Sequence, residues 1–484
     1  MKKNHLYYLH IAIFLIITFG FGFLPPFAQI TTVGMKVLGV FIGVIYAWCF
    51  IALDWPSMVA LCALGITGYS TGGASALFLS GWSFQILPPI VLSFLLAAGI
   101  SKTHLTDYIS DKLLSIKWLA GKPFVLIAAI LVAQAILNLL QCAYAGLFIL
   151  WGLAENISTK AGYPKKNLFN TIIVTSTMAV YCWSAFIFPF NPGALMQIGF
   201  FQQGFPGLEL PFTGWIFLFL TFTIAYILLW TLIIKFIFRP DFSAISQLDL
   251  TAFKKSDAIQ RMDTSQKFGL SILIGFVIAM FIPKLLPDTW FITQIFTRLG
   301  LTGCLAIAVV IMVAYRKNDG EHYLDLQSAS HSISWSVLWL LIATEPLAAA
   351  FNASECGIMA SIMSVVTPLL TTLNPTVFLI ICVIVLGAIT QVVHNLVLQV
   401  VFIPLLCPLY LQMGGNPFIM LIGLVVALNA AFTTPAASWS SAMMFGMDTT
   451  LRSKMYLLGF GHFVFSLLLF FILGIPLVNI FLPY

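Results

Sequence analysis

Residues 136–151 read ILNLLQCAYAGLFILW, and residues 389–404 read ITQVVHNLVLQVVFIP. Each stretch is largely apolar, and each has a polar pair at its centre that begins at Gln141 in the first stretch and at His394 in the second. These two residues are 253 positions apart. Polar interruptions of an apolar segment mark substrate or ion sites when they lie at membrane depth. The two stretches therefore predict two related binding elements.

A second pair of motifs keeps the same spacing. Trp82-Ser83 and Trp335-Ser336 are also 253 positions apart, and each is expected to open a long apolar segment upstream of a polar pair. Two offsets that agree to the residue indicate a duplicated unit. We therefore expect the fold to contain two repeats.

Composition restricts the class of protein. Of the 484 residues, 61% are hydrophobic and only 8% are charged, which is far more apolar material than a water-soluble core requires. Apolar segments of about 20 residues recur along the chain, and this length crosses a hydrocarbon layer about 30 Å thick. A transmembrane β-barrel would show alternating segments of about ten residues instead. The sequence predicts an all-α, polytopic membrane protein.

The first apolar stretch, residues 5–24, follows Lys2-Lys3 and so resembles a signal peptide. Pro25-Pro26 comes next in place of a small-residue cleavage site, and we expect a retained first helix. The net charge of +6 comes mostly from loop lysines, which argues against a nucleic-acid-binding surface. The eight cysteines are scattered without CxxC or Cys/His spacing, so neither disulfides nor a metal site is expected.

Eleven segments are predicted to cross the membrane. They are residues 6–24, 34–53, 56–71, 84–100, 167–190, 213–237, 267–287, 298–315, 334–350, 416–436 and 455–480. The two polar pairs lie between these spans, in predicted re-entrant hairpins near residues 120–158 and 374–412 that enter and leave the membrane on one side. Backbone that leaves the helix at that depth has to be satisfied by protein or water.

The positions of lysine and arginine predict the orientation. Most of them fall in loops that the expected spans place on one side: Lys2, Lys3, Lys102, Lys112, Lys117, Lys122, Lys160, Lys165, Lys166, Arg239, Lys254, Lys255, Arg261, Arg316, Lys317, Arg452 and Lys454. By the positive-inside rule that side is cytoplasmic. We therefore expect a protein of the cell inner (plasma) membrane with a cytoplasmic N-terminus and an external C-terminus. The odd number of spans predicts inverted repeats, with the first hairpin open to the cytoplasm and the second to the outside.

Two further segments lie outside the spans. Residues 101–116 carry apolar side chains at helical spacing and predict an interfacial helix on the cytoplasmic surface, while their counterpart, residues 354–369, has no Lys or Arg. Residues 239–266 form the longest polar stretch and the expected cytoplasmic loop between the repeats. The expected domains are N-terminal scaffold helices over residues 1–77, repeat 1 over 78–238, this loop, and repeat 2 over 267–484.

The stretch TPAASWSSAMMFG, which begins at Thr434, resembles a motif of the divalent anion/sodium symporter family. That family carries di- and tricarboxylates and sulfate, and its pattern at this place is P-x-A-T-P-P-N-x-x-x-F-G. The residues that match or stand at positions of this pattern are Pro435, Ala437, Ser438, Trp439, Ser440, Ser441, Phe445 and Gly446. In the first half, the run Asn-Pro-Gly-Ala from Asn191 stands where the family has T-P-P-N, and the resemblance covers about residues 30–480.

The family carries Ser-Asn-Thr at both hairpin tips, and this chain departs from that signature. Residues 141–143 are Gln-Cys-Ala and residues 394–396 are His-Asn-Leu, so Asn395 alone keeps a signature residue. The glycine-rich turn that the family has in its first half is bulky here, over residues 183–190, whereas residues 429–431 in the second half stay small. A cation site built from backbone carbonyls needs small neighbours, so a remaining site is expected in the second repeat.

The resemblance implies a substrate held between the two hairpins, a transport domain that moves against a scaffold in an elevator-like motion, and a homodimer. Seven residues are expected to bind the substrate: Gln141, Cys142, Asn191, His394, Asn395, Ser438 and Ser441. Four are expected to take part in ion coupling: His394, Asn395, Ser440 and Glu345. Asn138 and Gln391 also keep the spacing of 253, and could either donate to a carboxylate or join helices.

Two of these candidates are ionisable groups inside predicted apolar segments. His394 titrates near physiological pH in its reference state, so it could carry a proton or attract a carboxylate; alternatively it is a neutral ring bonded to backbone. Glu345, in the run LLIATEPLAAAF, could exchange a proton in place of a sodium ion, or could mark a helix break with Pro346. Sodium coupling, proton coupling and anion exchange therefore stay open, with Na⁺ or H⁺ as the coupling ion.

The sequence predicts a secondary active transporter of a small divalent anion, with a di- or tricarboxylate as first choice, that works by alternating access. The alternative is a degenerate family member that acts as an anion channel or as a non-transporting sensor. HExxH is absent and no paired intramembrane aspartates or Ser/His arrangement is found, so an enzyme is not expected. The expected partners are the anionic substrate, the lipid bilayer and a second copy of the chain, and no nucleic acid.

Overall fold

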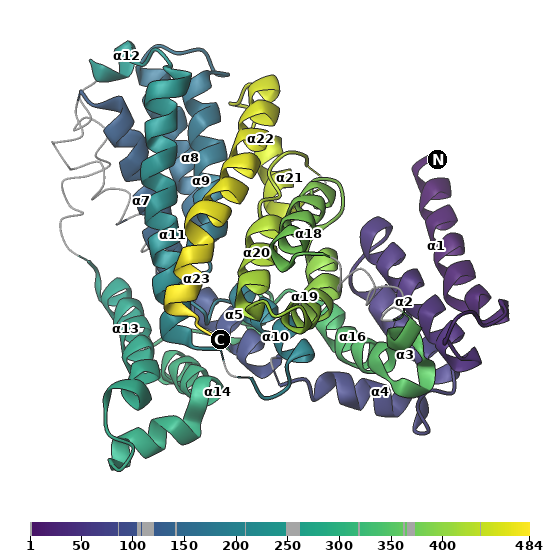
Figure 1. Ribbon diagram of the computed structural model, residues 1–484. Coiled ribbons are helices and arrows are strands. Elements are labelled where there is room, and N and C mark those ends of the chain that lie inside the picture. The colour runs from purple at the N-terminus through teal and green to yellow at the C-terminus, as the bar shows by residue number, and fades with distance from the viewer. Residues whose placement is uncertain are drawn as a thin grey trace.

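The computed structural model of the protein describes residues 2–85, 87–103, 108, 121–140, 143–208, 210–247, 262–317, 320–361, 364, 373–435 and 437–484. Within these residues every regular element is a helix, and the all-α, polytopic membrane fold predicted from the sequence is confirmed. Most of the expected interfacial helix over residues 101–116 and part of its counterpart over 354–369 lie outside the described residues. Figure 1 shows an N-terminal group of helices, a large central bundle, and a pair of helices at the opposite edge.

Seven helices in the described part of the chain are long and apolar enough to cross a membrane. They are His5–Phe23, Thr32–Phe50, Phe212–Phe238, Thr264–Pro283, Phe291–Ala314, Asn395–Gln412 and Arg452–Phe481. Six of them coincide with expected spans, and Asn395–Gln412 is instead the second arm of the second expected hairpin. The expected span over residues 84–100 belongs to a pair of helices bent by 51°.

The other four expected spans coincide with apolar helices of 10–17 residues, and all but Trp335–Phe351 are shorter than predicted. They are Trp55–Ile66, Leu168–Ser184, Trp335–Phe351 and Pro417–Asn429. In two of them the backbone leaves the helix before the apolar sequence ends, at residues 185 and 430 rather than at 190 and 436. Apolarity alone therefore overestimates helix length where a segment is interrupted inside the protein.

The N-terminal group packs around one helix from the second half. It comprises α1 (Lys2–Gly20), α2 (Thr32–Phe50), α3 (Trp55–Ile66), α4 (Gly73–Trp82) and α16 (Trp335–Asn352), and α16 packs against α2, α3 and α4. Trp335 begins its helix as expected, but Trp82 ends α4 instead of opening a helix. The domain boundary expected after residue 77 falls inside α4, so a helix crosses it.

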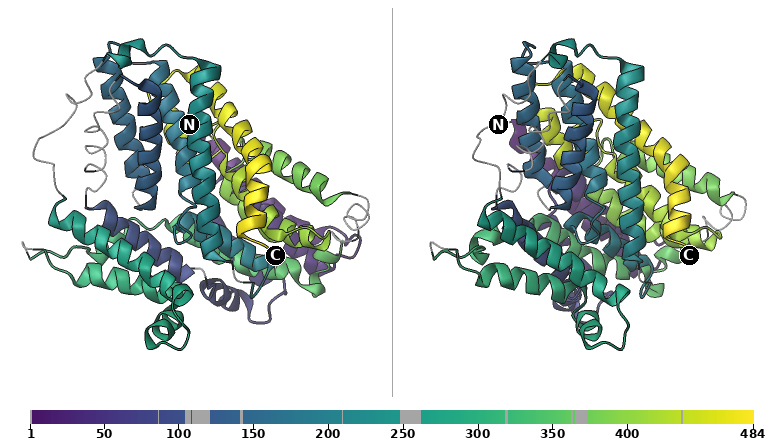
Figure 2. Two further views of the ribbon diagram at one scale, coloured as in Figure 1. Left: turned by 60° about the vertical axis from the view of Figure 1, so that its left-hand side comes forward. Right: turned by 90° about the vertical axis from the view of Figure 1, so that its left-hand side faces the viewer.

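A second group lies across the lower end of the central bundle. It contains α5 (Leu87–Ser101), α13 (Thr264–Leu285), α14 (Phe291–Ala314) and the short α15 (Leu326–Ser330), and Figure 2 shows α13 and α14 beside α5. The helix α14 is kinked at Gly300, where a positive φ of 56° suits a residue without a side chain. This kink divides α14 close to residue 298, where the sequence predicted that the span begins.

The central bundle repeats one order of elements. In the first half it contains α7 (Pro123–Leu139), α8 (Ala143–Lys160), α9 (Leu168–Ser184), α10 (Pro192–Gly204) and α11 (Phe212–Ile233), followed by a π-helical turn Ile234–Phe238. In the second half it contains α18 (Pro375–Ile389), α19 (Asn395–Gln412), α20 (Pro417–Asn429), α21 (Trp439–Gly446) and α22 (Arg452–Leu469), followed by a π-helical turn Phe470–Gly474 and α23 (Ile475–Phe481). Each half is thus a helical hairpin, a short helix, a non-helical break, a second short helix and a long helix.

The two halves interlock inside this bundle. Both arms of each hairpin pack on the helix that follows, α7 and α8 on α9, and α18 and α19 on α20. Across the halves, α10 packs against α19 and α22 packs against α9. Because such contacts in a membrane depend on close packing and hydrogen bonds, the second hairpin is held by its own half and, through α10, by the first half.

Prolines inside two helices free carbonyl groups that glycines of other helices approach. Pro346 in α16 has no N–H, which leaves the Ile342 carbonyl without its helical partner. A Cβ atom at Gly81 of α4 would lie 2.1 Å from that oxygen, so only glycine fits there. At Pro408 in α19, the freed Pro404 carbonyl lies in the same way against Gly204 of α10. Both helices are therefore fixed to neighbours at their proline sites.

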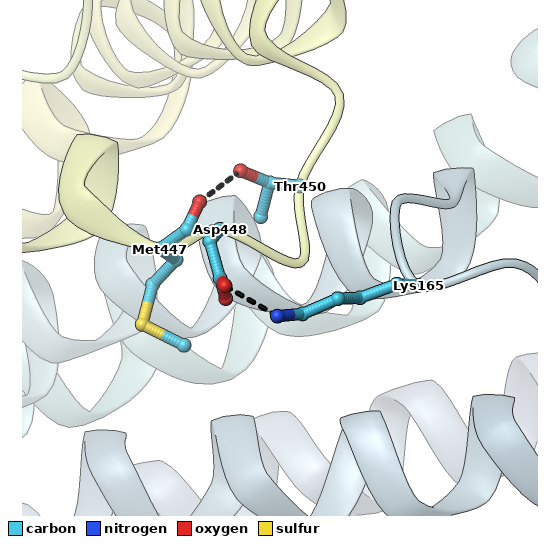
Figure 3. Close-up of polar contacts among 4 residues, drawn as sticks. All are labelled: Lys165, Met447, Asp448 and Thr450. Atoms are coloured by element: carbon cyan, nitrogen blue, oxygen red, sulfur yellow. Dashed lines mark hydrogen bonds and ion pairs between the residues drawn. The ribbon is translucent and has the colours of Figure 1, made fainter.

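An exposed ion pair joins the two halves at one end of the bundle. Figure 3 shows Lys165, in the loop before α9, facing Asp448, in the loop before α22, with 2.5 Å between Nζ and Oδ2. The same loops share a backbone hydrogen bond, because the Asn167 amide donates to the Thr449 carbonyl over 3.4 Å. Leu451 N also donates to Thr171 Oγ1 in the first turn of α9 over 2.9 Å. Lys165 holds the pKa of the Asp448 carboxyl below its usual value. Two loops that the charge pattern assigned to one side of the membrane thus lie together.

Candidate functional site

The turn between α18 and α19, residues 390–394, is the predicted tip of the second hairpin. It is hydrogen-bonded to the second break, residues 430–438 between α20 and α21. The Asn395 amide donates to the Ala437 carbonyl over 3.2 Å, and the Thr434 hydroxyl donates to the carbonyl of a tip residue, Gln391. The tip and the second break therefore form one unit.

The Gln391 side chain spans this break. Its Nε2 atom donates to the Ala430 carbonyl over 2.9 Å, and its Oε1 atom accepts from the Thr433 amide over 3.0 Å. Backbone groups that leave a helix in a membrane need such partners. Gln391, which the sequence offered both as a carboxylate donor and as a link between helices, acts here as a link.

Three amide side chains meet beside the tip. Asn429, the last residue of α20, accepts through Oδ1 from Asn395 Nδ2 at 3.5 Å and from Gln399 Nε2 at 3.2 Å. Two oxygen atoms in this region, Gln399 Oε1 and Thr433 Oγ1, are buried without a hydrogen-bond partner. Buried oxygens of this kind are rare in folded proteins and need an explanation, such as a bound ion or water.

The three serines of the sequence motif gather at the start of α21. Ser438 caps the helix, because its Oγ accepts from the Ser441 amide over 3.1 Å. The Ser441 hydroxyl donates to the Thr434 carbonyl over 2.7 Å and closes the loop of the break. Ser440 Oγ lies 3.3 Å from Ser438 Oγ. Ser438 and Ser441 are buried, while Ser440 is partly exposed.

Two helix N-termini converge where the tip meets the break. Asn395 is the first residue of α19, and its amide is bonded to Ala437, which directly precedes the N-cap of α21. Each N-terminus carries a partial positive charge, which favours anions. The arrangement can therefore hold a carboxylate or another oxyanion without a charged side chain.

His394 takes the capping position of α19. Its Nδ1 atom accepts from the Leu396 amide over 3.3 Å. An imidazolium ion has no acceptor nitrogen, so this cap requires the neutral ring with its proton on Nε2. The structure thus gives His394 the backbone-bonded role that was one of the two alternatives open from the sequence.

The first break, residues 185–191 between α9 and α10, is filled by aromatic side chains. Phe186, Phe188 and Phe190 are buried, and their rings pack against other aromatic rings at centroid distances of 5.0 to 6.0 Å. Phe276 of α13 closes the cluster against Phe188 and Phe190. The bulk that the sequence shows in this stretch therefore occupies the space inside the break.

Several polar groups near the first break are bonded within the protein, whereas Trp183 Nε1 and Gln197 Oε1 on its two sides are buried without a partner. Trp215 Nε1 donates to the Phe186 carbonyl over 2.6 Å. Asn191 caps α10, since its Oδ1 accepts from the Gly193 amide over 2.9 Å. Asn138 Nδ2, at the position that matches Gln391, donates to the Tyr181 carbonyl over 2.9 Å. The remaining predicted residues of this half, Gln141 and Cys142, lie outside the described residues.

Comparison with known proteins decides the family. The family described as the sodium:sulfate symporter transmembrane region matches residues 2–480. The chain belongs to this family. The family resemblance expected from the motif at Thr434 is thereby confirmed, and membership of a symporter family points to a transporter rather than an enzyme.

Two curated relatives share little sequence identity with this chain. Sodium-dependent dicarboxylate transporter SdcS from Staphylococcus saprophyticus is 22% identical over 274 residues, which is 56% of this chain and 51% of the relative. The same-named protein from Staphylococcus aureus (strain USA300) is 22% identical over 273 residues. The chain thus matches about half the length of these relatives.

A solved structure has the same fold. It is the YdaH transporter of Alcanivorax borkumensis, with a TM-score of 0.60, 17% sequence identity, and coverage of 86% of this chain and 90% of the other. At this identity the likeness extends to the fold alone.

The structure does not bring Glu345 to the second hairpin. Glu345 lies in α16 of the N-terminal group, where its Oε2 atom accepts from the Ser80 hydroxyl of α4 over 2.5 Å. The side chain is partly exposed. Its contacts place it in the helices packed around α16, whereas His394, Asn395, Ser438, Ser440 and Ser441 form the hairpin unit. Its expected part in ion coupling therefore stays a separate prediction.

Three polar residues of the bundle were missed by the sequence analysis. Gln399 and Asn429 join the amide cluster, and Gln399 follows Asn395 by one helical turn, a spacing that could have revealed it. His462 is fully buried in α22, where its ring nitrogens face Tyr226 Oη at 2.8 Å and Ser176 Oγ at 3.4 Å. A lone histidine in a long apolar helix was the available signal.

Proposed function

We propose that this member of the symporter family is a secondary active transporter that carries a small divalent anion together with sodium through the second hairpin and second break. The observation that carries the proposal is the convergence of the α19 and α21 N-termini beside buried oxygen atoms without partners. Alternating access to this one unit would move anion and cation together.

The anion is bound by helix ends and neutral donors. The N-termini of α19 and α21 supply partial positive charge at the place where the Asn395 amide is bonded to Ala437. Asn395, Ser438, Ser440 and Ser441 lie at this place, and Asn395 and Ser440 are partly exposed. His394, Asn191 and the two residues of the first tip complete the proposed substrate contacts.

The cation is held by uncharged oxygens. Gln399 Oε1, Thr433 Oγ1 and backbone carbonyls of residues 430–435 and 437 are the candidate ligands, and unwound backbone at such breaks is the usual sodium ligand in transporters. Among the described residues no group of three or more His, Cys, Asp or Glu is placed to hold a metal ion. The neutral set favours a monovalent cation over a divalent metal.

Sodium is preferred over a proton on chemical grounds. Protonation of His394 would remove the nitrogen that caps α19, so a proton there would disturb the hairpin instead of completing it. Glu345, the other protonatable candidate, contacts α4 and not the hairpin unit. The names of the family and of its relatives agree with sodium as the coupling ion.

A dicarboxylate is the first-choice substrate and sulfate the second. The dicarboxylate is supported by relatives named sodium-dependent dicarboxylate transporters, at 22% identity. Sulfate is supported by the description of the family. Both are dianions that helix N-termini and neutral donors can bind. A homodimer, a cytoplasmic N-terminus and inverted orientation of the repeats belong to the proposal as well.

The test is uptake into proteoliposomes that contain the purified protein. Succinate, citrate, 2-oxoglutarate and sulfate are supplied in turn, under an inward sodium gradient, an inward proton gradient, or neither. Saturable uptake of one dianion that needs the sodium gradient is the expected result. Uptake that follows only the proton gradient, or only trapped internal anion, would replace sodium symport by proton symport or exchange.

The same assay addresses the alternative of a channel or sensor. Anion flux that does not saturate and does not accumulate against a gradient would indicate a channel. Binding of a dianion to detergent-solubilised protein, with no flux in proteoliposomes, would indicate a sensor. Liposomes without protein give the background rate of anion flux, which is subtracted in both cases.

A further inference from the structure

A buried polar cluster lies between the two halves of the bundle. It consists of His462 from α22, Ser176 from α9, and Tyr226 and Trp230 from α11, and all four side chains are buried. Trp230 Nε1 donates to Ser176 Oγ over 2.9 Å, and the indole lies 3.8 Å from the imidazole, centroid to centroid. Both ring nitrogens of His462 therefore face hydroxyl groups of the first half, Nδ1 that of Tyr226 and Nε2 that of Ser176.

The cluster reaches the second break through α22. The Phe432 ring stands edge-on to His462, with 6.1 Å between centroids and 70° between planes. One turn before His462, a Cβ atom at Gly459 would lie 2.4 Å from the Phe432 carbonyl oxygen, so the backbone of α22 touches the break. Phe432 immediately precedes Thr433, whose hydroxyl is one of the oxygens without a partner.

The cluster also reaches the first break. Trp183 lies in the last turn of α9, directly before residues 185–191, and its ring packs on Tyr226 at 6.0 Å and on Phe432 at 6.2 Å. Both breaks are therefore in contact with the same rigid group of aromatic and hydroxyl side chains. Interiors packed in this way transmit small displacements, because close-packed side chains leave no space to absorb them.

We propose that His462 is a positioning residue for the coupling-ion site. By its two ring contacts to Tyr226 and Ser176, it fixes α22 against α9 and α11, and so sets the place of Phe432 and of the oxygen groups beside it. His462 does not touch the substrate or the ion. The inference rests on the proposed sodium site for its transport consequence, and on the contacts above for its structural part.

The test compares His462→Leu with variants that remove fewer hydrogen-bonding groups from the cluster, and with one that changes the contact between α22 and the second break. His462→Gln keeps a side chain that can donate and accept, and Tyr226→Phe removes only the hydroxyl that faces Nδ1. Gly459→Ala displaces the Phe432 carbonyl without changing the imidazole. Thr177→Val is the matched control, since it removes a buried hydrogen bond of α9, that from Trp151 Nε1 at 2.8 Å, outside the cluster.

The structural readout is hydrogen–deuterium exchange of backbone amides in the full-length protein. His462→Leu and Gly459→Ala are expected to speed exchange in residues 430–438, with His462→Gln and Tyr226→Phe closer to wild type and Thr177→Val unchanged there. If His462→Leu leaves exchange in residues 430–438 at the wild-type level, or if Thr177→Val changes it equally, the positioning role is refuted. This readout does not need transport.

The transport readout is the split between apparent affinity and maximal rate. His462→Leu is expected to raise the sodium concentration for half-maximal uptake about tenfold at a nearly unchanged Vmax per folded protein, which corresponds to about 1.4 kcal/mol of binding free energy. His462→Gln should recover part of this loss. A lower Vmax with wild-type sodium affinity would contradict the proposal. Faster exchange together with sodium-independent uptake by the wild type would keep the positioning role and refute the sodium site.

Discussion

The two helix breaks of the central bundle occupy equivalent places in their halves and differ in what fills them. The first break contains buried phenylalanines, and the carbonyl of Phe186 is bonded by Trp215. The second break contains small residues, hydroxyls and amides, and two of its neighbouring oxygens have no partner. A repeated fold thus keeps two similar frameworks, while the polar groups that we propose for binding are concentrated in the second.

This difference has an electrostatic meaning. A carrier that imports a dianion against an inside-negative potential needs extra cations to do so electrogenically. If only the second break binds sodium, one cation accompanies two negative charges. The difference between the two breaks therefore predicts how much charge moves in each transport cycle. Mutants, imposed membrane potentials and thermal unfolding can test it.

The largest expected effect is the loss of the second hairpin tip. Asn395→Ala should abolish saturable uptake while the protein stays folded, because it removes a donor to the anion and the partner of Asn429 Oδ1. Uptake into proteoliposomes is measured per folded protein. Asn416→Ala is the control, since it removes the cap at Phe418 N, at the far end of α20. Uptake by Asn395→Ala at the wild-type level would refute the proposal that the second hairpin tip binds the anion.

The second effect concerns the number of sodium ions. With one sodium ion per dianion, a potential of 100 mV, inside negative, should oppose accumulation by about 2.3 kcal/mol, or about fiftyfold in the accumulation ratio. Uptake is measured at imposed potassium diffusion potentials with valinomycin, with sodium varied at each potential. The sodium dependence should follow a Hill coefficient of about 1. A coefficient of 2 or more, or acceleration by the inside-negative potential, would place a working cation site at the first break.

The third prediction separates stability from binding in the first break. Phe190→Ala should destabilise the protein by about 3 kcal/mol, because it empties a well-packed aromatic cluster. The sodium concentration for half-maximal uptake should change less than twofold. Thermal unfolding in detergent and uptake are measured on the same preparation. A large change in sodium affinity at unchanged stability would mean that the aromatic break takes part in binding.

The smallest expected effect is at the exposed ion pair between the halves. Lys165 lowers the pKa of Asp448 below its ordinary value of 3.8, so the stabilisation is present above that value and is lost as the pH falls through the lowered pKa. Asp448→Asn should therefore unfold at a slightly lower temperature than wild type at neutral pH, with the difference vanishing in acid. Both side chains are exposed, which keeps the effect small. A difference that persists in strong acid, once the Asp448 carboxyl is protonated, would exclude the ion pair as its cause.

Much of this fold was predictable from sequence because apolar length and polar interruption are local signals. The spacing of 253 located both hairpins, and the helices that begin at Ala143 and Asn395 agree with it to one residue. The contrast between bulky residues 183–190 and small residues 429–431 correctly predicted which break is filled. Helix ends were less predictable, as at Ser184 and Asn429, since apolar sequence continues past both.

The missed residues depend on partners that are distant along the chain. Asn429 and Gln399 acquire a role only when α19 packs on α20, and His462 only when α22 packs on α9 and α11. A sequence shows polar residues in apolar helices but not which helix they face. The same limit applies to Glu345, an ion-coupling candidate whose contact with Ser80 of α4 the sequence does not show.

The contact of α10 with α19 has a consequence for biosynthesis. α10 is only 13 residues long, and its glycine-lined end meets the proline-freed carbonyl of α19, which is synthesised after the whole of α11 to α18. When the first half has been inserted into the bilayer, α19, which packs on α10, has not yet been synthesised. The face of α10 that packs on α19 is therefore uncovered during this time. We expect truncated chains that end before Asn395 to be the preferred targets of membrane quality control.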